Sequence, residues 1–170
     1  SARTAPDHPL YALTRSTAQE LVDRGMMVIT GAGAGVMAAA NEGAGPERGF
    51  GLAIRLPFEP EPNAWVHPDR LVNFKYFFTR KLIFIKESAG FVLCPGGFGT
   101  NDEAFELLTL LQTGKTEPRP VVLLDLEDGT YWETWLDFVR RELVEPGYID
   151  EDDLRLLRTA HRPQDAVAEI

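Results

Sequence analysis

A glycine-rich turn at residues 94–103 constrains the fold of this chain more than any other stretch. The apolar run Gly90–Cys94 is typical of a short buried strand, and residues 104–112 carry apolar side chains at helical spacing. Three glycines therefore lie in a tight strand-to-helix turn, followed by Thr100 and carboxylates. Backbone N–H groups in such a turn can approach a ligand closely, and the positive end of a helix favours an anion. The stretch predicts a phosphate cradle with an acidic side chain beside it.

The same residues also have a purely structural interpretation. Thr100 and Glu103 have the spacing of a capping box, in which the threonine caps the helix and the glutamate reaches back to its amide. The turn has neither the lysine of a P-loop nor the spacing of a G-x-G-x-x-G fingerprint. The motif alone leaves both phosphate binding and helix capping open.

A second glycine-rich turn, Gly31–Gly35, follows the apolar run 26–30 and precedes a small-residue pattern over 36–44. It resembles a dinucleotide-binding turn, although a tight connection with close helix–sheet packing explains it equally well. Four prolines make residues 57–70 a stiff loop. The remaining patterns predict strands over 50–56 and 120–125, and helices over 10–24, 73–88, 131–144, 150–157 and 163–170.

The alternation of strands and helices predicts one domain over residues 1–170. Its expected fold is α/β, a Rossmann-like open and mainly parallel sheet with helices on both faces, because the strands are almost continuously apolar. Ligands bind such sheets beyond the carboxyl ends of the strands. Both glycine turns lie at such ends, and they line one crevice if their strands are neighbours. This convergence favours a nucleotide-type ligand.

The formal charge of −9 argues against nucleic acids and membrane surfaces as partners, since a basic field drives both kinds of binding. An anionic ligand then needs local cations, and Lys75, Arg80 and Lys81 are the densest group in the middle of the chain. A solvated helix face is the alternative explanation for them. The single cysteine, Cys94, cannot form an internal disulfide, and neither a membrane span nor a signal peptide is recognisable. These features predict a cytoplasmic protein.

The chain resembles the LONELY GUY (LOG) family of cytokinin-riboside 5′-monophosphate phosphoribohydrolases, whose members are also described as possible lysine decarboxylases. Arg80-Lys81 followed by P-G-G-x-G-T-x-x-E is the most specific part of the resemblance, which covers nearly the whole chain. The blocks that carry it stand in the family's order and are residues 30–37, 54–59, 77–81 and 95–103.

The resemblance implies hydrolysis of the N-glycosidic bond of a nucleoside 5′-monophosphate to free base and ribose 5-phosphate, with no metal or organic cofactor. Arg80 and Glu103 match the family's catalytic pair. A carboxylate such as Glu103 would stabilise an oxocarbenium-like transition state or activate water. The implied phosphate-binding residues are Gly96, Gly97, Phe98, Gly99 and Thr100. Further substrate contacts are implied for Gly33, Met37, Glu59, Lys81 and Thr109.

Three departures from the family pattern are visible. Family chains begin with a strand ending in a Gly-Ser-x-Arg turn, so the start at Ser1-Ala2-Arg3 indicates that this strand is missing here. Ala38 stands where the family commonly has Glu or Gly, which leaves base selectivity open. Asn101 replaces a usual leucine.

The alternatives are a non-catalytic carrier or sensor of a nucleotide or phosphorylated cofactor, a lysine decarboxylase and a nicotinamide oxidoreductase. A carrier needs the glycine loop but not Glu103. Neither Lys81 nor Lys86 has the context of a pyridoxal phosphate site, and the 31–35 turn lacks an acidic residue at the offset that a ribose requires. The resemblance also implies a homodimer or larger homo-oligomer, for which the aromatic helix 74–85 is a plausible interface.

Overall fold

The computed structural model describes residues 1–54 and 61–170. The chain folds into two compact units, Ser1–Ser88 and Ala89–Ile170, and each is described by itself. Glu59 and most of the segment 54–59 that contributes to the resemblance lie outside the described residues. No helix among the described residues is both long enough and apolar enough to cross a membrane.

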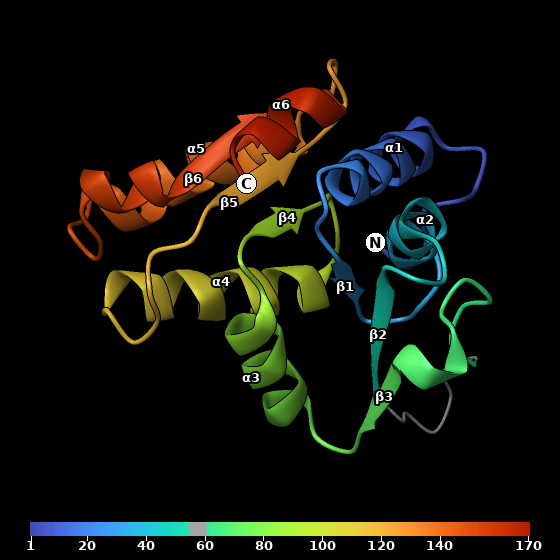
Figure 1. Cartoon of the computed structure of the whole chain (residues 1–170). Coiled ribbons are helices and arrows are strands. Elements are labelled where there is room, and N and C mark those ends of the chain that lie inside the picture. The colour runs from blue at the N-terminus through green and yellow to red at the C-terminus, as the bar shows by residue number, and fades with distance from the viewer. Residues whose placement is uncertain (55–60) are drawn as a thin grey trace. The chain divides into compact units, whose positions relative to one another are not determined.

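The first unit contains a three-stranded parallel sheet in the order β1-β2-β3 (Figure 1). Val28 is in register with Gly49, and Gly51 with Leu71. The elements in chain order are α1 (Pro9–Asp23), β1 (Val28–Thr30), α2 (Val36–Ala44), β2 (Gly49–Ile54), the 3-10 turn η1 (Pro68–Arg70), β3 (Leu71–Phe74) and α3 (Phe77–Glu87).

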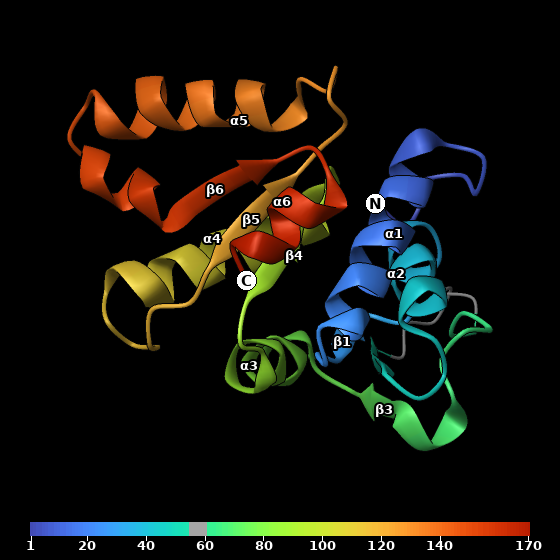
Figure 2. The same ribbon diagram turned by 45° about the horizontal axis from the view of Figure 1, so that its top comes forward.

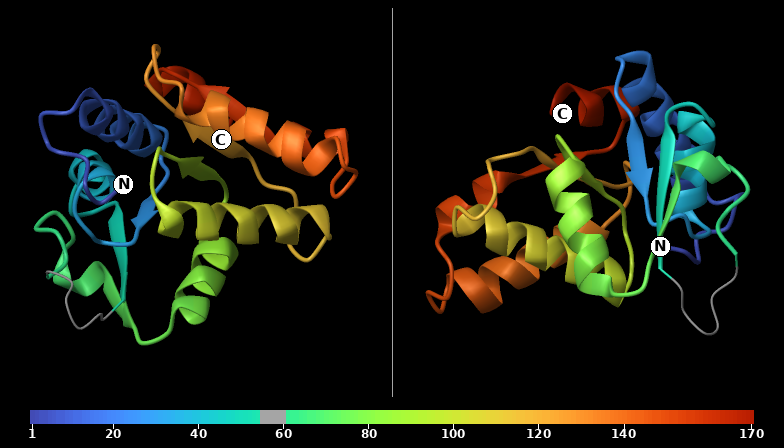
Figure 3. Two further views of the ribbon diagram at one scale, coloured as in Figure 1. Left: turned by 180° about the vertical axis from the view of Figure 1, so that it is seen from behind. Right: turned by 60° about the horizontal axis from the view of Figure 1, so that its bottom comes forward.

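Helices α1 and α2 pack against each other beside β1 and β2 (Figures 1 and 3). The Tyr11 hydroxyl donates to Glu42 at 2.9 Å, and Arg15 pairs with the same carboxylate at 3.1 Å. Gly43 allows this approach, because a side chain there would collide with the Arg15 carbonyl. Gly43 of α2 thus allows close packing of this helix against α1.

The second unit contains another three-stranded parallel sheet, in the order β4-β5-β6 (Figure 2). The central strand is fully buried, and the Trp132 indole, also buried, donates to the Leu124 carbonyl at 3.1 Å. The elements in chain order are β4 (Phe91–Leu93), α4 (Phe98–Gln112), β5 (Val121–Leu124), α5 (Tyr131–Val139), the π-turn η2 (Arg140–Val144), the 3-10 helix η3 (Glu151–Leu156), β6 (Leu157–Ala160) and α6 (Pro163–Ala168).

The predicted parallel α/β fold is confirmed, with strands hydrogen-bonded in two sets of three among the described residues. Two short strands differ from the prediction. β3 occupies the start of the helix expected over 73–88, which begins at Phe77 instead. β6 is not predicted, and its first residue, Leu157, falls at the end of the helix expected over 150–157. Its pattern of two exposed polar residues between two buried ones gives no apolar run to recognise. Both strands lie at sheet edges, where pairing with a buried neighbour outweighs weak local signals.

Candidate functional site

The glycine loop after β4 leads directly into α4, whose N-cap is Gly97 and whose first residue is Phe98. The helix therefore begins six residues before the first residue of the pattern recognised in the sequence. Thr100 is inside the first turn, and its hydroxyl lies where a side chain on Gly96 would have to fit. The first backbone N–H groups of an α-helix have no partner within the helix, so this turn presents donors at the loop. The structure thus has the strand–loop–helix arrangement in which the motif is expected to lie.

The helix start at Phe98 overturns the capping-box interpretation. A capping box needs Thr100 at the N-cap and Glu103 at the third helical position, but Thr100 itself occupies the third position and Glu103 the sixth. Local spacing suggested a cap because the sequence does not show that Phe98 and Gly99 are already helical. Glu103 is accordingly a half-buried residue of the helix body.

The other predicted residues on this loop and helix differ in exposure. The Phe98 side chain is 97% exposed, so it contributes little to the packing of the loop. Thr109 is exposed, and its hydroxyl donates to the Phe105 carbonyl of its own helix at 2.7 Å. Thr109 is six positions after Glu103, which at about 100° per residue places the two on different faces of α4. The structure does not bring Thr109 and Glu103 together.

Three residues outside the predicted set tie the glycine loop to α5. The Tyr131 hydroxyl donates to the Gly96 carbonyl at 2.7 Å. The Asn101 amide donates to the Tyr131 hydroxyl at 3.1 Å and to the Gly97 carbonyl at 3.0 Å, and it accepts from the Trp135 indole at 2.9 Å. In the sequence, Asn101 stands out only as a departure from the family pattern, because its α5 partners lie about thirty residues further along the chain.

In the first unit, the 31–35 turn has a strained backbone and little space. Ala32 is buried with φ 61°, and its N–H bonds to the Thr30 hydroxyl at 3.0 Å. A methyl group built on Gly33 would lie 2.5 Å from Met37 Cε, and one on Gly31 would lie 2.9 Å from Met37 Sδ. The end of the Met37 side chain therefore lies over this turn, and it would have to shift if either glycine carried a side chain.

Arg80 lies beside the same turn. A methyl group built on Gly31 would be 3.7 Å from Arg80 Nη1, and the guanidinium carbon is 5.2 Å from the centre of the Phe77 ring. Arg80 and the next residue, Lys81, are half-buried on α3. The solvated-face alternative therefore does not describe Arg80, whose guanidinium lies against a ring and a glycine turn. The first unit gathers the predicted residues Gly33, Met37 and Arg80 in one place.

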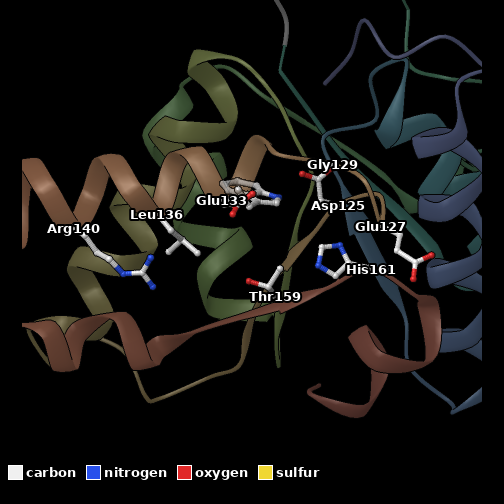
Figure 4. A pocket seen from close by; sticks show the side chains of 9 residues that line it. Asp125, Glu127, Gly129, Glu133, Leu136, Arg140, Thr159 and His161 are labelled. Carbon is white, nitrogen blue, oxygen red and sulfur yellow. The ribbon is translucent and has the colours of Figure 1, made fainter.

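A cavity of about 360 Å³ lies elsewhere in the second unit, at the carboxyl ends of β5 and β6 (Figure 4). Its lining includes the carboxylates of Asp125, Glu127 and Glu133, against the single guanidinium of Arg140 and the ring of His161. The Asp125 carboxylate accepts hydrogen bonds from the backbone N–H groups of Leu126, at 2.8 Å, and of Tyr131, at 3.1 Å. None of the predicted site residues lines this cavity, and its negative charge makes it unsuited to a phosphorylated ligand.

The model of the family described as "Possible lysine decarboxylase", the LOG family, matches residues 22–170. The chain belongs to this family. This chain is 30% identical over 157 residues to the probable cytokinin riboside 5′-monophosphate phosphoribohydrolase LOGL3 of Oryza sativa subsp. japonica. The match covers 90% of this chain and 72% of that protein.

Other relatives are similar over a shorter stretch. This chain is 32% identical over 91 residues to the cytokinin riboside 5′-monophosphate phosphoribohydrolase LOG1 of Arabidopsis thaliana. The match covers 54% of this chain but only 41% of that protein. Among solved structures, the molybdenum cofactor carrier protein of Chlamydomonas reinhardtii has a TM-score of 0.65 at 22% identity, covering 99% of this chain and 88% of that one. An X-ray structure from the Northeast Structural Genomics Consortium has the same score and identity, covering 99% and 91%. These structures show the shared fold.

Proposed function

We propose that this LOG-family protein hydrolyses the N-glycosidic bond of a nucleoside 5′-monophosphate, either AMP or a cytokinin riboside monophosphate. Its products are the free base and ribose 5-phosphate. One observation carries the proposal. This chain belongs to the LOG family, has Arg80 and Glu103, and has the complete P-G-G-x-G-T loop at the start of a helix. The relatives from rice and Arabidopsis, whose names state this activity, support it.

The glycine loop is the proposed binding site of the 5′-phosphate. It combines the N-terminal N–H groups of the 15-residue helix α4 with the Thr100 hydroxyl, and the helix dipole adds a favourable field for an anion. Such remote binding fixes the ribose relative to the reacting groups, which lowers the entropic part of the barrier. This assignment agrees with the net charge of −9, since the loop can bind a phosphate without a basic surface.

Glu103 and Arg80 are the proposed catalytic pair. When the glycosidic bond breaks, its electron pair leaves with the base, and positive charge develops on the ribosyl ring. The Glu103 carboxylate stabilises that charge or takes a proton from the water that attacks C1′. The water leaves its hydroxyl on C1′, and the proton that it loses balances the proton that the departing base takes up. Arg80 orients the substrate by charge-assisted hydrogen bonds. Gly33 belongs to the 31–35 turn, and Met37 and Arg80 lie beside it. Gly33 and Met37 are proposed to contact the nucleotide. Lys81, Glu59 and Thr109 remain further proposed contacts, and Thr109 is the weakest because it is on another face of α4 from Glu103.

A second candidate function is non-catalytic carriage of a nucleotide or phosphorylated cofactor. The structural likeness to a molybdenum cofactor carrier supports it, since that protein has the same fold. A carrier would need the phosphate loop but would have no use for a carboxylate at position 103. The retention of Glu103 together with Arg80 therefore favours the hydrolase.

We also propose that the protein forms a homodimer or a larger homo-oligomer through α3. This helix and its N-cap expose three large apolar side chains, those of Tyr76, Phe78 and Leu82, each more than half accessible. The Tyr76 and Phe78 rings stack with their centres 5.7 Å apart, so they form one continuous apolar surface. Exposed surfaces of this kind mark association sites in soluble proteins.

The catalytic assignment is tested by assaying base release by the Glu103→Gln and Arg80→Ala variants. Glu106→Gln is the matched control, because it removes a half-buried carboxylate from the same helix three residues later. We expect both catalytic variants to lose at least about a hundredfold in kcat, as for removal of a group that acts in the transition state. The control should remain near parent activity. Binding of nucleotide without base release by the parent protein would replace the hydrolase with the carrier.

A further inference from the structure

A directional chain of hydrogen bonds runs from α5 through Asn101 to the glycine loop. The Trp135 indole donates to Asn101 Oδ1, one Asn101 amide hydrogen goes to the Tyr131 hydroxyl, and that hydroxyl donates to the Gly96 carbonyl. The second Asn101 amide hydrogen goes to the Gly97 carbonyl. Asn101 and Tyr131 each accept one hydrogen bond and donate another, an arrangement in which the bonds strengthen one another.

The two carbonyls that this chain holds determine where the next two amides point. A trans peptide is planar, so the C=O of one residue and the N–H of the next point in opposite directions. Tyr131 holds the Gly96 carbonyl, and Asn101 holds the Gly97 carbonyl with both its side-chain amide and its backbone N–H. The N–H groups of Gly97 and Phe98 therefore point away from these two side chains. Both amides belong to the N-cap region of α4, where no intrahelical acceptor exists for them.

We propose that Asn101 and Tyr131 are positioning residues, which fix the direction of the Gly97 and Phe98 N–H groups toward the phosphate of the substrate. The inference rests on the proposed function, because it assumes that the glycine loop binds a 5′-phosphate. Neither side chain touches the substrate. They act through the peptide planes, so their contribution is specific to ligands that carry the phosphate.

The side chain at position 101 is well suited to this role. An amide supplies two N–H donors and one carbonyl acceptor in a single small group, and all three are used here. A leucine of similar size would fill the same space and keep the backbone N–H bond to the Gly97 carbonyl, which is 3.2 Å long here, but it could not donate a side-chain hydrogen bond to Gly97 or to Tyr131. The replacement of the family's usual leucine by Asn101 thus adds side-chain hydrogen bonds that hold the loop beyond the backbone bond that a leucine would keep.

The test compares the affinities of the full chain for AMP and for adenosine, measured by calorimetry. The variants are Tyr131→Phe, which removes one hydroxyl and keeps the ring, and Asn101→Leu, which removes all three amide hydrogen bonds. The control is Tyr148→Phe, since Tyr148 is 77% exposed in the same unit. We expect Tyr131→Phe to weaken AMP binding about fivefold and Asn101→Leu more, in line with the loss of one and of several hydrogen bonds. Adenosine binding should not change, which also shows that the variants are folded.

The outcomes separate this inference from the proposed function. If the parent prefers AMP over adenosine and both variants keep the parent's ratio of AMP affinity to adenosine affinity, the positioning role is overturned while phosphate binding stands. An equal loss for AMP and adenosine also overturns it, because a purely structural tie would affect both ligands. If the parent shows no preference for AMP, the phosphate site and the inference both fail. If the parent prefers AMP without releasing base, only the hydrolase fails, and the ratio in the variants still decides the role of Asn101 and Tyr131.

Discussion

The buried amide of Asn41 accepts a hydrogen bond from the Thr30 hydroxyl at 2.6 Å, and this contact ties the end of β1 to α2. The same Asn41 oxygen accepts from the Asn63 amide at 3.1 Å, while the Asn41 amide donates to the Phe50 carbonyl at 3.2 Å. Asn63 in turn donates to the Gly33 carbonyl at 3.0 Å. The 31–35 turn is therefore held by a buried polar network.

Replacing Asn41 by alanine should lower the free energy of unfolding by about 3 kcal/mol, because it leaves several buried donors and acceptors without their partner. The exposed Gln19, which donates to Asp23 at 2.9 Å on the surface of α1, gives the matched control Gln19→Ala. That variant should change stability by less than about 0.5 kcal/mol. Urea denaturation of the three proteins measures both values. A loss below about 1 kcal/mol for Asn41→Ala would show that the network is not a major source of stability.

Two glycines flanking α2 allow backbone strain to be separated from steric overlap. Gly35 and Gly45 both have positive φ, 64° and 71°. A side chain on Gly45 would meet nothing within 4 Å, whereas one on Gly35 would collide with the backbone of Ser1 and Ala2. We expect Gly45→Ala to lower the free energy of unfolding by about 1 to 3 kcal/mol, because this backbone conformation is nearly exclusive to glycine.

The variant Gly35→Ala should cost at least about 2 kcal/mol more than Gly45→Ala, because overpacking is added to the same strain. Thermal or chemical denaturation of both variants gives the difference directly. Equal losses would mean that the chain near Ser1 does not lie against α2 in solution.

The ion pair at the start of α6 predicts a pH-dependent contribution to stability. Hydrogen bonds from Arg162 to Asp165, at 2.7 and 3.0 Å, hold the pKa of this carboxyl below its ordinary value of 3.8. A depressed pKa means that the unfolded chain takes up the proton first as the pH falls. The stabilisation is therefore complete above pH 3.8 and disappears as the pH falls through the lower pKa of the folded state.

The Asp165→Asn variant should accordingly be less stable than the parent near pH 7, with a difference that shrinks at about pH 2.5. The effect is small, since the pair is exposed and solvent screens it. Melting temperatures at the two pH values measure it, with Asp7→Asn as a control at another exposed aspartate. A difference that stays constant with pH would contradict the assigned pKa shift.

The proposed α3 interface predicts that Phe78→Ser favours the monomer. Phe78 is 65% exposed and stacks on Tyr76, so a polar residue there removes apolar area from the interface without disturbing a core. Sedimentation velocity at micromolar concentration should show a dimer for the parent and at least a tenfold weaker dimer for the variant, since burying a Phe contributes about 2 kcal/mol. Tyr148→Ser is the control. A monomeric parent would rule out the interface.

The sequence predicts the buried elements of the fold well because their signals are strong. The fully apolar β5 and the small-residue helix α2 are found at the expected positions. The edge strands β3 and β6 are missed, since a partly exposed strand of four residues has no run of apolar side chains. The start of α4 is misplaced because Phe98 and Gly99 resemble a loop locally, although they are helical in the structure.

The candidate site can be predicted from the sequence where its residues form a contiguous motif. It cannot be predicted where hydrogen-bond partners are far apart in the chain. Residues 96–100 stand out as a glycine-rich run, and Arg80 and Glu103 follow from the family resemblance. The contribution of Tyr131 and Trp135 depends on the packing of α5 against the glycine loop, which no local pattern encodes. Their role becomes visible only in the three-dimensional structure.

The most direct test of the account is the release of products from AMP and from isopentenyladenosine monophosphate by the full-length parent protein, with adenosine as the substrate that lacks the phosphate. The account predicts equal amounts of free base and ribose 5-phosphate from at least one of the nucleotides, and far slower release of adenine from adenosine, because remote phosphate binding contributes to catalysis. The ratio of the two nucleotide rates then identifies the preferred base. Tight nucleotide binding with no product from either nucleotide would contradict the hydrolase and favour a carrier.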